Sequence, residues 1–122
     1  MELIIERDVL RAYTGKKRKV VIPEGVRMIG SGAFRGNKHI RKLVIPADVE
    51  IIAGEAFAGC KRLRSVTCKH KRLKSIGKRA FAGCKRLKRV VFAGYVWDIA
   101  PDAFADCKRA RITQPSAPYS NG

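Results

Sequence analysis

The sequence repeats itself every 23 or 24 residues, and this repetition constrains the fold more than any other feature. The dipeptide Ala-Phe marks the repeat, at Ala33-Phe34, Ala56-Phe57, Ala80-Phe81 and Ala103-Phe104. The flanking residues recur as well, which gives four copies at 18–40, 41–63, 64–87 and 88–110. A period in the range of roughly 20–50 residues is typical of solenoids, in which stacked copies bury the apolar face that one copy leaves exposed.

Within each copy, the order of the apolar residues predicts short strands joined by turns. Each copy opens with apolar side chains at alternate positions, such as Leu43 and Ile45 in the second copy. Alternation of this kind is the periodicity of a strand. A turn, a second short apolar pair such as Val49 and Ile52, and the tight segment carrying Ala-Phe follow. No stretch sustains the apolar spacing of a helical face, so we expect a mainly β structure without long helices.

Stacking places equivalent residues of successive copies above one another, and this predicts two ladders of core side chains. The first contains the repeated phenylalanines Phe34, Phe57, Phe81 and Phe104. The second contains Asn37, Cys60, Cys84 and Cys107. We interpret these cysteines as small, buried, free thiols. No Cys-x-x-Cys motif occurs and neither histidine has a ligand-like spacing to a cysteine, so we expect no metal site.

The repeat resembles that of the BspA-like leucine-rich repeat family. Residues 40–63 follow the family pattern L-x-x-V-x-I-P-x-x-V-x-x-I-G-x-x-A-F-x-G-C-x-x-L nearly letter for letter. Residues 2–15, with Val9-Leu10 and Tyr13-Thr14-Gly15, are similar to the β-hairpin that caps the N-terminal end in this family. The resemblance covers residues 2–112. It implies a right-handed leucine-rich-repeat solenoid of parallel strands, short turns and 3-10 segments, a role in adhesion or macromolecular binding, and no catalytic residues.

The sequence departs from the family pattern in three respects. The third copy has one extra residue, and the basic segment 69–72 stands where earlier copies have a proline and a tight turn. Ala110 replaces a large apolar residue, and residues 112–114 are a weak start to a fifth copy. The chain is also short for the family. We predict one solenoid over residues 1–113, with a cap at 2–17 and repeats at 18–40, 41–63, 64–87 and 88–110, followed by a flexible tail at 114–122.

The charge of the chain is strongly basic and is segregated by repeat position. Lys and Arg number 27 against 10 Asp and Glu, a formal net charge of +17. In a leucine-rich repeat the first strand lies on the concave face, with its intervening positions pointing outward. Those positions carry pairs such as Arg18-Lys19 and Arg41-Lys42, and a second basic pair precedes them in most copies. Parallel strands stack about 4.8 Å apart, so we expect these pairs to form a basic wall along one edge of the concave sheet.

Two groups of residues make up the predicted partner-binding surface. The basic wall consists of Arg18, Lys19, Arg41, Lys42, Lys61, Arg62, Arg64, Lys85, Arg86, Lys88, Arg89, Lys108 and Arg109. The basic knob, in the longer third copy, consists of Lys69, Lys71 and Arg72. An alternative interpretation is that these are simply solvated turn positions, which accept Lys and Arg freely. A purely solubilising surface would mix signs, however, because like charges on neighbouring strands repel each other.

Three kinds of partner fit such a surface. The first choice is an acidic protein surface, because leucine-rich solenoids mostly bind protein on the concave face. The second is a nucleic-acid backbone, bound without sequence preference, or a role as a factor acting on a nucleic-acid enzyme. Aromatic residues make up only 7% of the chain and are not arranged as a stacking platform, which counts against this alternative. The third is adhesion to an anionic glycan or surface.

The sequence predicts neither an enzyme nor a cofactor. No Ser/His/Asp or Cys/His constellation and no Walker loop occurs, and Gly30-Ser31-Gly32 is an isolated Gly-x-Gly within a repeat turn. Asp98 and Asp102 lie four apart in a segment without helical pattern, so they are not a persuasive acid–base pair.

The sequence also bears on location and assembly. Acids fall within the first eight residues, and no apolar run approaches the ~18 residues of a membrane span, so we expect a cytoplasmic protein. The weakly capped C-terminal end is a candidate surface for homo- or hetero-oligomer formation.

Overall fold

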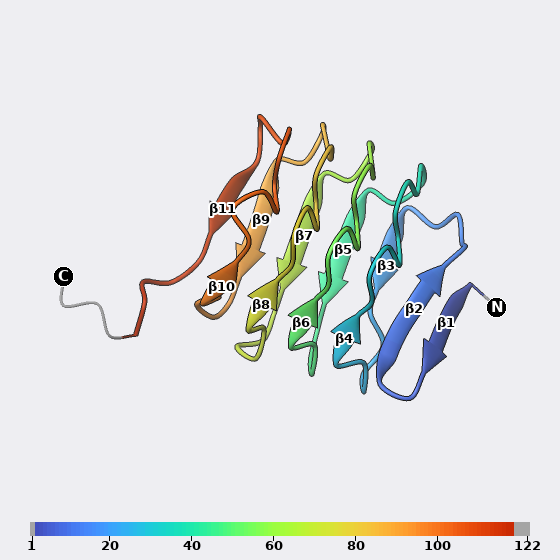
Figure 1. Cartoon of the computed structure of the whole chain (residues 1–122), viewed down its shortest axis with the longest axis horizontal. Coiled ribbons are helices and arrows are strands. Elements are labelled where there is room, and N and C mark those ends of the chain that lie inside the picture. The colour runs from blue at the N-terminus through green and yellow to red at the C-terminus, as the bar shows by residue number, and fades with distance from the viewer. Residues whose placement is uncertain (1, 119–122) are drawn as a thin grey trace.

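The computed structural model describes residues 2–118 and shows a β-solenoid built from two sheets (Figure 1). The six-stranded sheet has the order β1 (Leu3–Glu6), β2 (Val9–Tyr13), β4 (Met28–Ile29), β6 (Ile51–Ile52), β8 (Ser75–Ile76) and β10 (Asp98–Ile99). The five-stranded sheet has the order β11 (Arg111–Thr113), β9 (Arg89–Phe92), β7 (Ser65–Cys68), β5 (Lys42–Ile45) and β3 (Lys19–Val21). Within the described residues there is no helix, and turns connect the strands.

The pairing of the strands follows from the stacking of copies. The hairpin β1–β2 is antiparallel, and every other strand pair is parallel. Strand β2 pairs with β4, so the hairpin covers the N-terminal end of the six-stranded sheet. The predicted fold class and the predicted N-terminal hairpin are therefore confirmed. At the other end, residues 119–122 of the predicted tail lie outside the described residues.

The phenylalanine ladder is confirmed and runs through the core between the two sheets. The ring centroids of Phe34 and Phe57 lie 4.6 Å apart, those of Phe57 and Phe81 5.0 Å apart, and those of Phe81 and Phe104 5.1 Å apart. Tyr13 of the hairpin stacks on Phe34 at 4.9 Å and so begins the ladder. The sequence repeat did not identify Tyr13 as a member, because the hairpin lacks the Ala-Phe marker.

The cysteine ladder is also confirmed, with free thiols that bond to the rung before them. The Sγ atoms of Cys60, Cys84 and Cys107 donate to the carbonyl oxygens of the phenylalanines one copy earlier, at 3.1, 3.2 and 2.9 Å. In the first copy, Asn37 takes this position because its neighbour is the hairpin. Its Nδ2 donates to the carbonyl oxygen of Gly15 at 3.1 Å. The phenylalanine carbonyl oxygens also accept a backbone hydrogen bond within their own turns, from Asn37 N, Cys60 N and Cys84 N, so each thiol adds a second donor that joins neighbouring copies.

The glycine two residues after each phenylalanine is required by the shape of the turn. Gly36, Gly59 and Gly83 have φ angles of 70°, 72° and 73°, which lie in the left-handed region. In the last copy, Asp106 occupies this position with φ 62°. Aspartate is one of the few other residues that visit this region routinely. Glycine therefore recurs in Phe-x-Gly because the backbone needs a left-handed φ angle there, and not because a side chain would lack space.

Replacing Gly59 by alanine is expected to lower the free energy of unfolding by about 1–2 kcal/mol, through left-handed backbone strain. A Cβ atom there would meet only ordinary contacts, the nearest at 3.8 Å, so steric overlap adds nothing. Gly59→Asp should cost less, because Asp106 shows that this side chain fits the turn. Urea unfolding of the two variants and the parent measures the difference, and equal losses for both variants would contradict this explanation.

Candidate partner-binding surface

The outward positions of the five-stranded sheet form one continuous row across all five strands. Lys19 pairs with Lys42, Lys42 with Ser65, Ser65 with Arg89, and Arg89 with Arg111. Four of these five side chains are cationic, and Ser65 is the single interruption. The row reaches one strand further than the sequence repeat indicated, because β11 adds a fifth strand to this sheet.

A second basic row lies immediately before the first, where the chain enters each strand. Backbone hydrogen bonds join its members: Arg41 N donates to the Arg18 carbonyl oxygen at 2.7 Å, Arg64 N to that of Arg41 at 2.8 Å, and Lys88 N to that of Arg64 at 2.9 Å. The side chains of this row are exposed except for Arg41, which is half-buried. The two rows bring seven residues of the predicted basic wall together on one side of one sheet.

The neutral positions beside these rows are less uniform than a flat apolar stripe. Val21 is 49% exposed at the edge strand β3, whereas Val44 on the neighbouring strand is 7% exposed and belongs to the buried core. Thr67 and Val91 are intermediate. The neutral positions beside the wall therefore differ in exposure from strand to strand.

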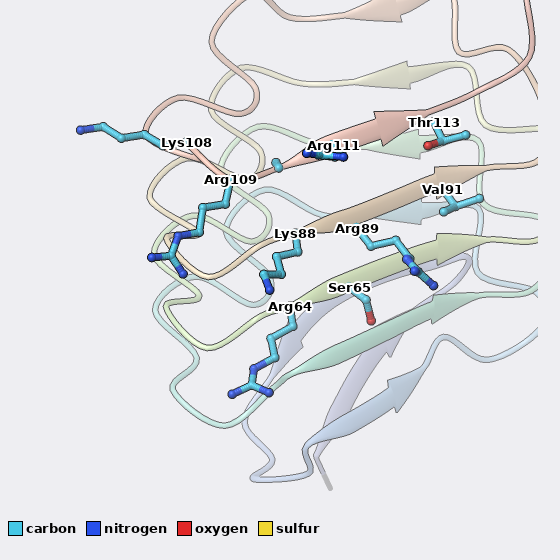
Figure 2. A pocket seen from close by; sticks show the side chains of 10 residues that line it. Arg64, Ser65, Lys88, Arg89, Val91, Lys108, Arg109, Arg111 and Thr113 are labelled. Carbon is cyan, nitrogen blue, oxygen red and sulfur yellow. The ribbon is translucent and has the colours of Figure 1, made fainter.

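An open groove of about 1250 Å³ lies over the C-terminal half of the sheet (Figure 2). Its lining residues are Arg64, Ser65, Lys88, Arg89, Val91, Lys108, Arg109, Ala110, Arg111 and Thr113. Six of them are basic and none is acidic. Figure 2 shows the side chains of Arg64, Lys88 and Arg109 projecting from the same side of the strands. Arg111 and Thr113 were not among the predicted site residues. Aligning residues 110–113 with 88–91 would have placed Arg111 in the row of Arg89.

A smaller depression of about 720 Å³ adjoins the groove at the turns. Lys85, Arg86, Asp106, Lys108 and Arg109 line it. Asp106 is thus an acid among the turn pairs of the basic wall, at a position that the sequence argument did not consider. It forms no ion pair within 4.0 Å with another described residue, so it reduces the local positive charge without neutralising any one side chain.

Half of the ten acids form ion pairs, and these lie elsewhere, along the six-stranded sheet and its turns: Glu6, Asp8, Asp48, Glu50 and Glu55. Arg27 lies 3.9 Å from Asp8 and 3.7 Å from Glu50, and Lys74 lies 3.0 Å from Glu50 on the other side. The hydrogen bond and charge of Lys74 lower the pKa of the Glu50 carboxyl. This row alternates in sign from rung to rung. Among residues 2–118, by contrast, no residue of the basic wall forms an ion pair.

Repulsion within the basic wall is visible at Arg41, the half-buried member near its centre. The pKa of the Arg41 guanidinium is lowered from its ordinary value. The causes, in order of size, are the charge of Arg18, partial burial, and the charges of Arg62, Arg64 and Arg86. Like charges that face each other on neighbouring strands are destabilising. A partner that supplies acidic groups would relieve this repulsion.

The basic knob does not join the basic wall. Segment 69–72 follows the last residue of β7, whereas the wall residues lie at the beginning of the strands. Arg72 is also paired, with its Nη1 donating to Asp48 Oδ1 at 3.2 Å. Its backbone N–H donates to Nδ1 of His70 at 3.0 Å, which fixes the loop. Lys69 and Lys71 are exposed at the same end of the sheet.

The described residues offer no site for a metal ion: no cluster of three or more His, Cys, Asp or Glu side chains is found among them. In the same part of the chain, no helix is long and apolar enough to cross a membrane.

Comparisons with known proteins agree on the repeat. The family model described as "BspA type Leucine rich repeat region (6 copies)" matches residues 5–120. No curated protein matches the sequence significantly.

Several solved structures share the architecture. A leucine-rich repeat protein from Bacteroides capillosus superposes with a TM-score of 0.71 at 22% identity, over 93% of this chain and 99% of that one. A leucine rich cell surface protein from Faecalibacterium prausnitzii gives 0.60 at 25% identity, over 89% and 35%. The T. pallidum leucine-rich repeat protein gives 0.58 at 27% identity, over 90% and 65%. The first of these likenesses shows the fold alone, and the chain spans only about a third of the second protein.

Proposed function

The chain belongs to the BspA-type leucine-rich repeat family, and from that premise we propose that it is a non-catalytic binding module whose basic wall, extended by Arg111, engages an acidic protein surface. The partner's carboxylates would lie over the two basic rows and in the groove beside β9 and β11. Such complementarity favours rapid association and orients the partner. The cytoplasmic location expected from the sequence stays a prediction, since one relative is a cell-surface protein.

One observation carries this proposal: charged side chains are arranged differently on the two sheets of the same solenoid. The row of Arg27, Glu50 and Lys74 alternates in sign and forms ion pairs. The row of Lys19, Lys42, Arg89 and Arg111 is interrupted only by the neutral Ser65 and contains no acid. Stacking of copies therefore does not by itself require like charges to face each other. Repulsion between the like charges of the basic wall lowers the stability of the fold, and a bound acidic surface would relieve it.

An acidic protein fits the groove better than a nucleic acid does. No lining residue of the groove is aromatic, whereas single-stranded nucleic acids are held largely by stacking of bases on aromatic rings. The repeated phenylalanines are committed to the core ladder. A duplex would meet only backbone contacts, since the described chain offers no helix for the major groove. Phosphate contacts alone would give sequence-independent binding that falls steeply with salt.

Neutralising the basic wall is expected to weaken binding of an acidic peptide by about tenfold or more, since several exposed charge contacts are lost together. The variant changes Arg41, Lys42, Arg64, Lys88 and Arg89 to Gln. The ligands are a labelled peptide rich in Asp and Glu and a single-stranded oligonucleotide of equal charge, each titrated into the full chain at about 0.15 M salt. Fluorescence anisotropy measures both affinities.

The matched control removes the same number of positive charges away from the five-stranded sheet, by changing Arg7, Arg35, Lys74, Lys78 and Arg79 to Gln. The proposal requires the control to bind the peptide nearly as well as the parent does. Equal losses in the two variants would mean that the binding is attraction by net charge alone. Tighter binding of the oligonucleotide than of the peptide, lost in the wall variant, would assign the surface to nucleic acid instead.

A further inference from the structure

Strand β11 is the last strand of the five-stranded sheet, and no other strand among residues 2–118 covers its outer edge. Its three residues are exposed, including Ile112, which is 42% exposed. Ile112 stands in the row of Leu43, Val66 and Val90, which are fully buried in their own strands. The difference arises because each of those strands is covered by the next copy, and β11 has no described strand on its outer side. The exposed isoleucine thus marks a place where one further strand would bury apolar surface.

The backbone of β11 also has hydrogen-bonding groups that point to this open edge. Arg111 N donates inward to the carbonyl oxygen of Lys88 at 2.8 Å. Successive backbone groups of a strand point to opposite sides, so the N–H and C=O groups of Ile112 point to the open edge. Among the described residues, segment 114–118 does not return to cover them. Figure 1 shows the segment from residue 114 to residue 118 leading away from the two sheets. The side chain of Gln114 accepts a hydrogen bond from Val96 N, a residue of the preceding copy.

The side chains beside Ile112 belong to the basic groove. Arg111 and Thr113 line it together with Lys88 and Arg89 of the preceding rung. A strand added to β11 would therefore have two different faces. Side chains opposite Arg111 and Thr113 would enter a groove that has six basic lining residues and no acidic one. The side chain opposite Ile112 would lie on the core side, over the partly buried Ala110 and Cys107.

A second copy of this chain is a poor occupant of the edge. Each copy carries a net charge of +17, so two copies repel each other. The other open edge of the five-stranded sheet is β3, whose Lys19 stands in the same row as Arg111. Head-to-tail stacking would continue the row of like charges and add no acid to it. Charge complementarity selects a different partner, one that supplies carboxylates.

We propose that β11 accepts an acidic, extended segment of a partner protein as an additional strand, with acidic and apolar residues alternating along that segment. This inference rests on the proposed function and specifies how part of the acidic partner is held. Backbone pairing with Ile112 fixes the strand, Arg111 and the groove select carboxylates on one face, and Ile112 selects an apolar residue on the other. Addition of a strand to an exposed sheet edge is a common mode of peptide recognition.

The test compares three kinds of peptide binding to the full chain at about 0.15 M salt. The first alternates Glu and Val, and the second has the same composition with all Glu residues before all Val residues. The third kind is the alternating peptide N-methylated either on every Glu or on every Val. Since alternate N–H groups of a strand point to opposite sides, only one of the two methylated sets can still pair with β11. We expect the alternating peptide to bind about tenfold more tightly than the block peptide, and one methylated set to lose that gain while the other keeps it.

Two further measurements locate the contact. Arg111→Gln should weaken binding of the alternating peptide, whereas Lys78→Gln, which removes one charge from a residue that does not line the groove, should not. Hydrogen exchange of the Ile112 amide should slow when the peptide is added. Equal binding of alternating and block peptides, or of the two methylated sets, would overturn strand addition while leaving acidic recognition by the basic wall intact. If neither unmethylated peptide binds, the proposed function fails together with this inference.

Discussion

Replacing Phe57 by alanine is expected to lower the free energy of unfolding by about 3–5 kcal/mol, the usual cost of removing a fully buried aromatic ring. Phe57 has no exposed surface and stacks between Phe34 at 4.6 Å and Phe81 at 5.0 Å. Its removal leaves a cavity in the middle of the ladder and ends two ring contacts at once. The backbone around it cannot collapse readily, because Phe57 N donates to the carbonyl oxygen of Ala80 at 2.7 Å and holds the rungs at a fixed spacing.

Phe104→Ala is the matched control, since it removes the same ring from the same repeat position. Phe104 is only partly buried and has one described stacking partner, Phe81 at 5.1 Å. Its loss should cost clearly less. Urea unfolding followed by circular dichroism measures both variants, with the slope of the transition checked for a change in the unfolded state. A cost for Phe104→Ala equal to or above that of Phe57→Ala would show that the end of the solenoid, rather than its middle, limits stability.

Alkylation of Cys60 in the native protein is expected to be about a thousandfold or more slower than in the unfolded chain at pH 8, because only the thiolate reacts. Burial raises the pKa of the Cys60 thiol from 9.0 to about 12, which removes nearly all thiolate at that pH. The bond from its Sγ to the carbonyl oxygen of Phe34 holds the thiol in the core. Mass spectrometry of peptides after timed iodoacetamide treatment gives the rate at each cysteine separately.

Cys107 is the internal control for this measurement. It occupies the same ladder but is only partly buried, in the last copy beside the open end. It should react first, well before Cys60 and Cys84. The protection of Cys60 should disappear in denaturant and should be weakened in Phe57→Ala, whose cavity adjoins it. Rapid alkylation of Cys60 in the folded parent would contradict the ladder as described.

The basic wall shows how far repeat position alone predicts a site. The outward basic pairs follow from the leucine-rich-repeat pattern that the sequence resembles, so Lys19, Lys42 and Arg89 were placed in one row before the structure was considered. Arg111 was missed because Ala110 breaks the repeat just where β11 begins. The basic knob was predicted to belong to the same binding surface only because its residues are basic. Its position beyond the end of β7, with Arg72 bonded to Asp48, depends on a loop that appears in one copy only.

The family resemblance of residues 2–15 implied the N-terminal hairpin, and the sequence by itself determined the repeat, the mainly β solenoid and the two core ladders. These depend on local periodicity and on equivalent residues meeting in successive copies, so a 23-residue spacing of Phe34 and Phe57 is sufficient to predict that the rings stack. Only the tertiary structure decided which charges are paired. Repeat position already separates the basic positions from the acids, but the pairing of strands decides that Glu50 lies between Arg27 and Lys74. It also decides that Lys42 pairs with Lys19 and Ser65, neither of which is acidic. The open edge at Ile112 was likewise decided by the fold, because exposure of a core position depends on whether another strand follows it in space.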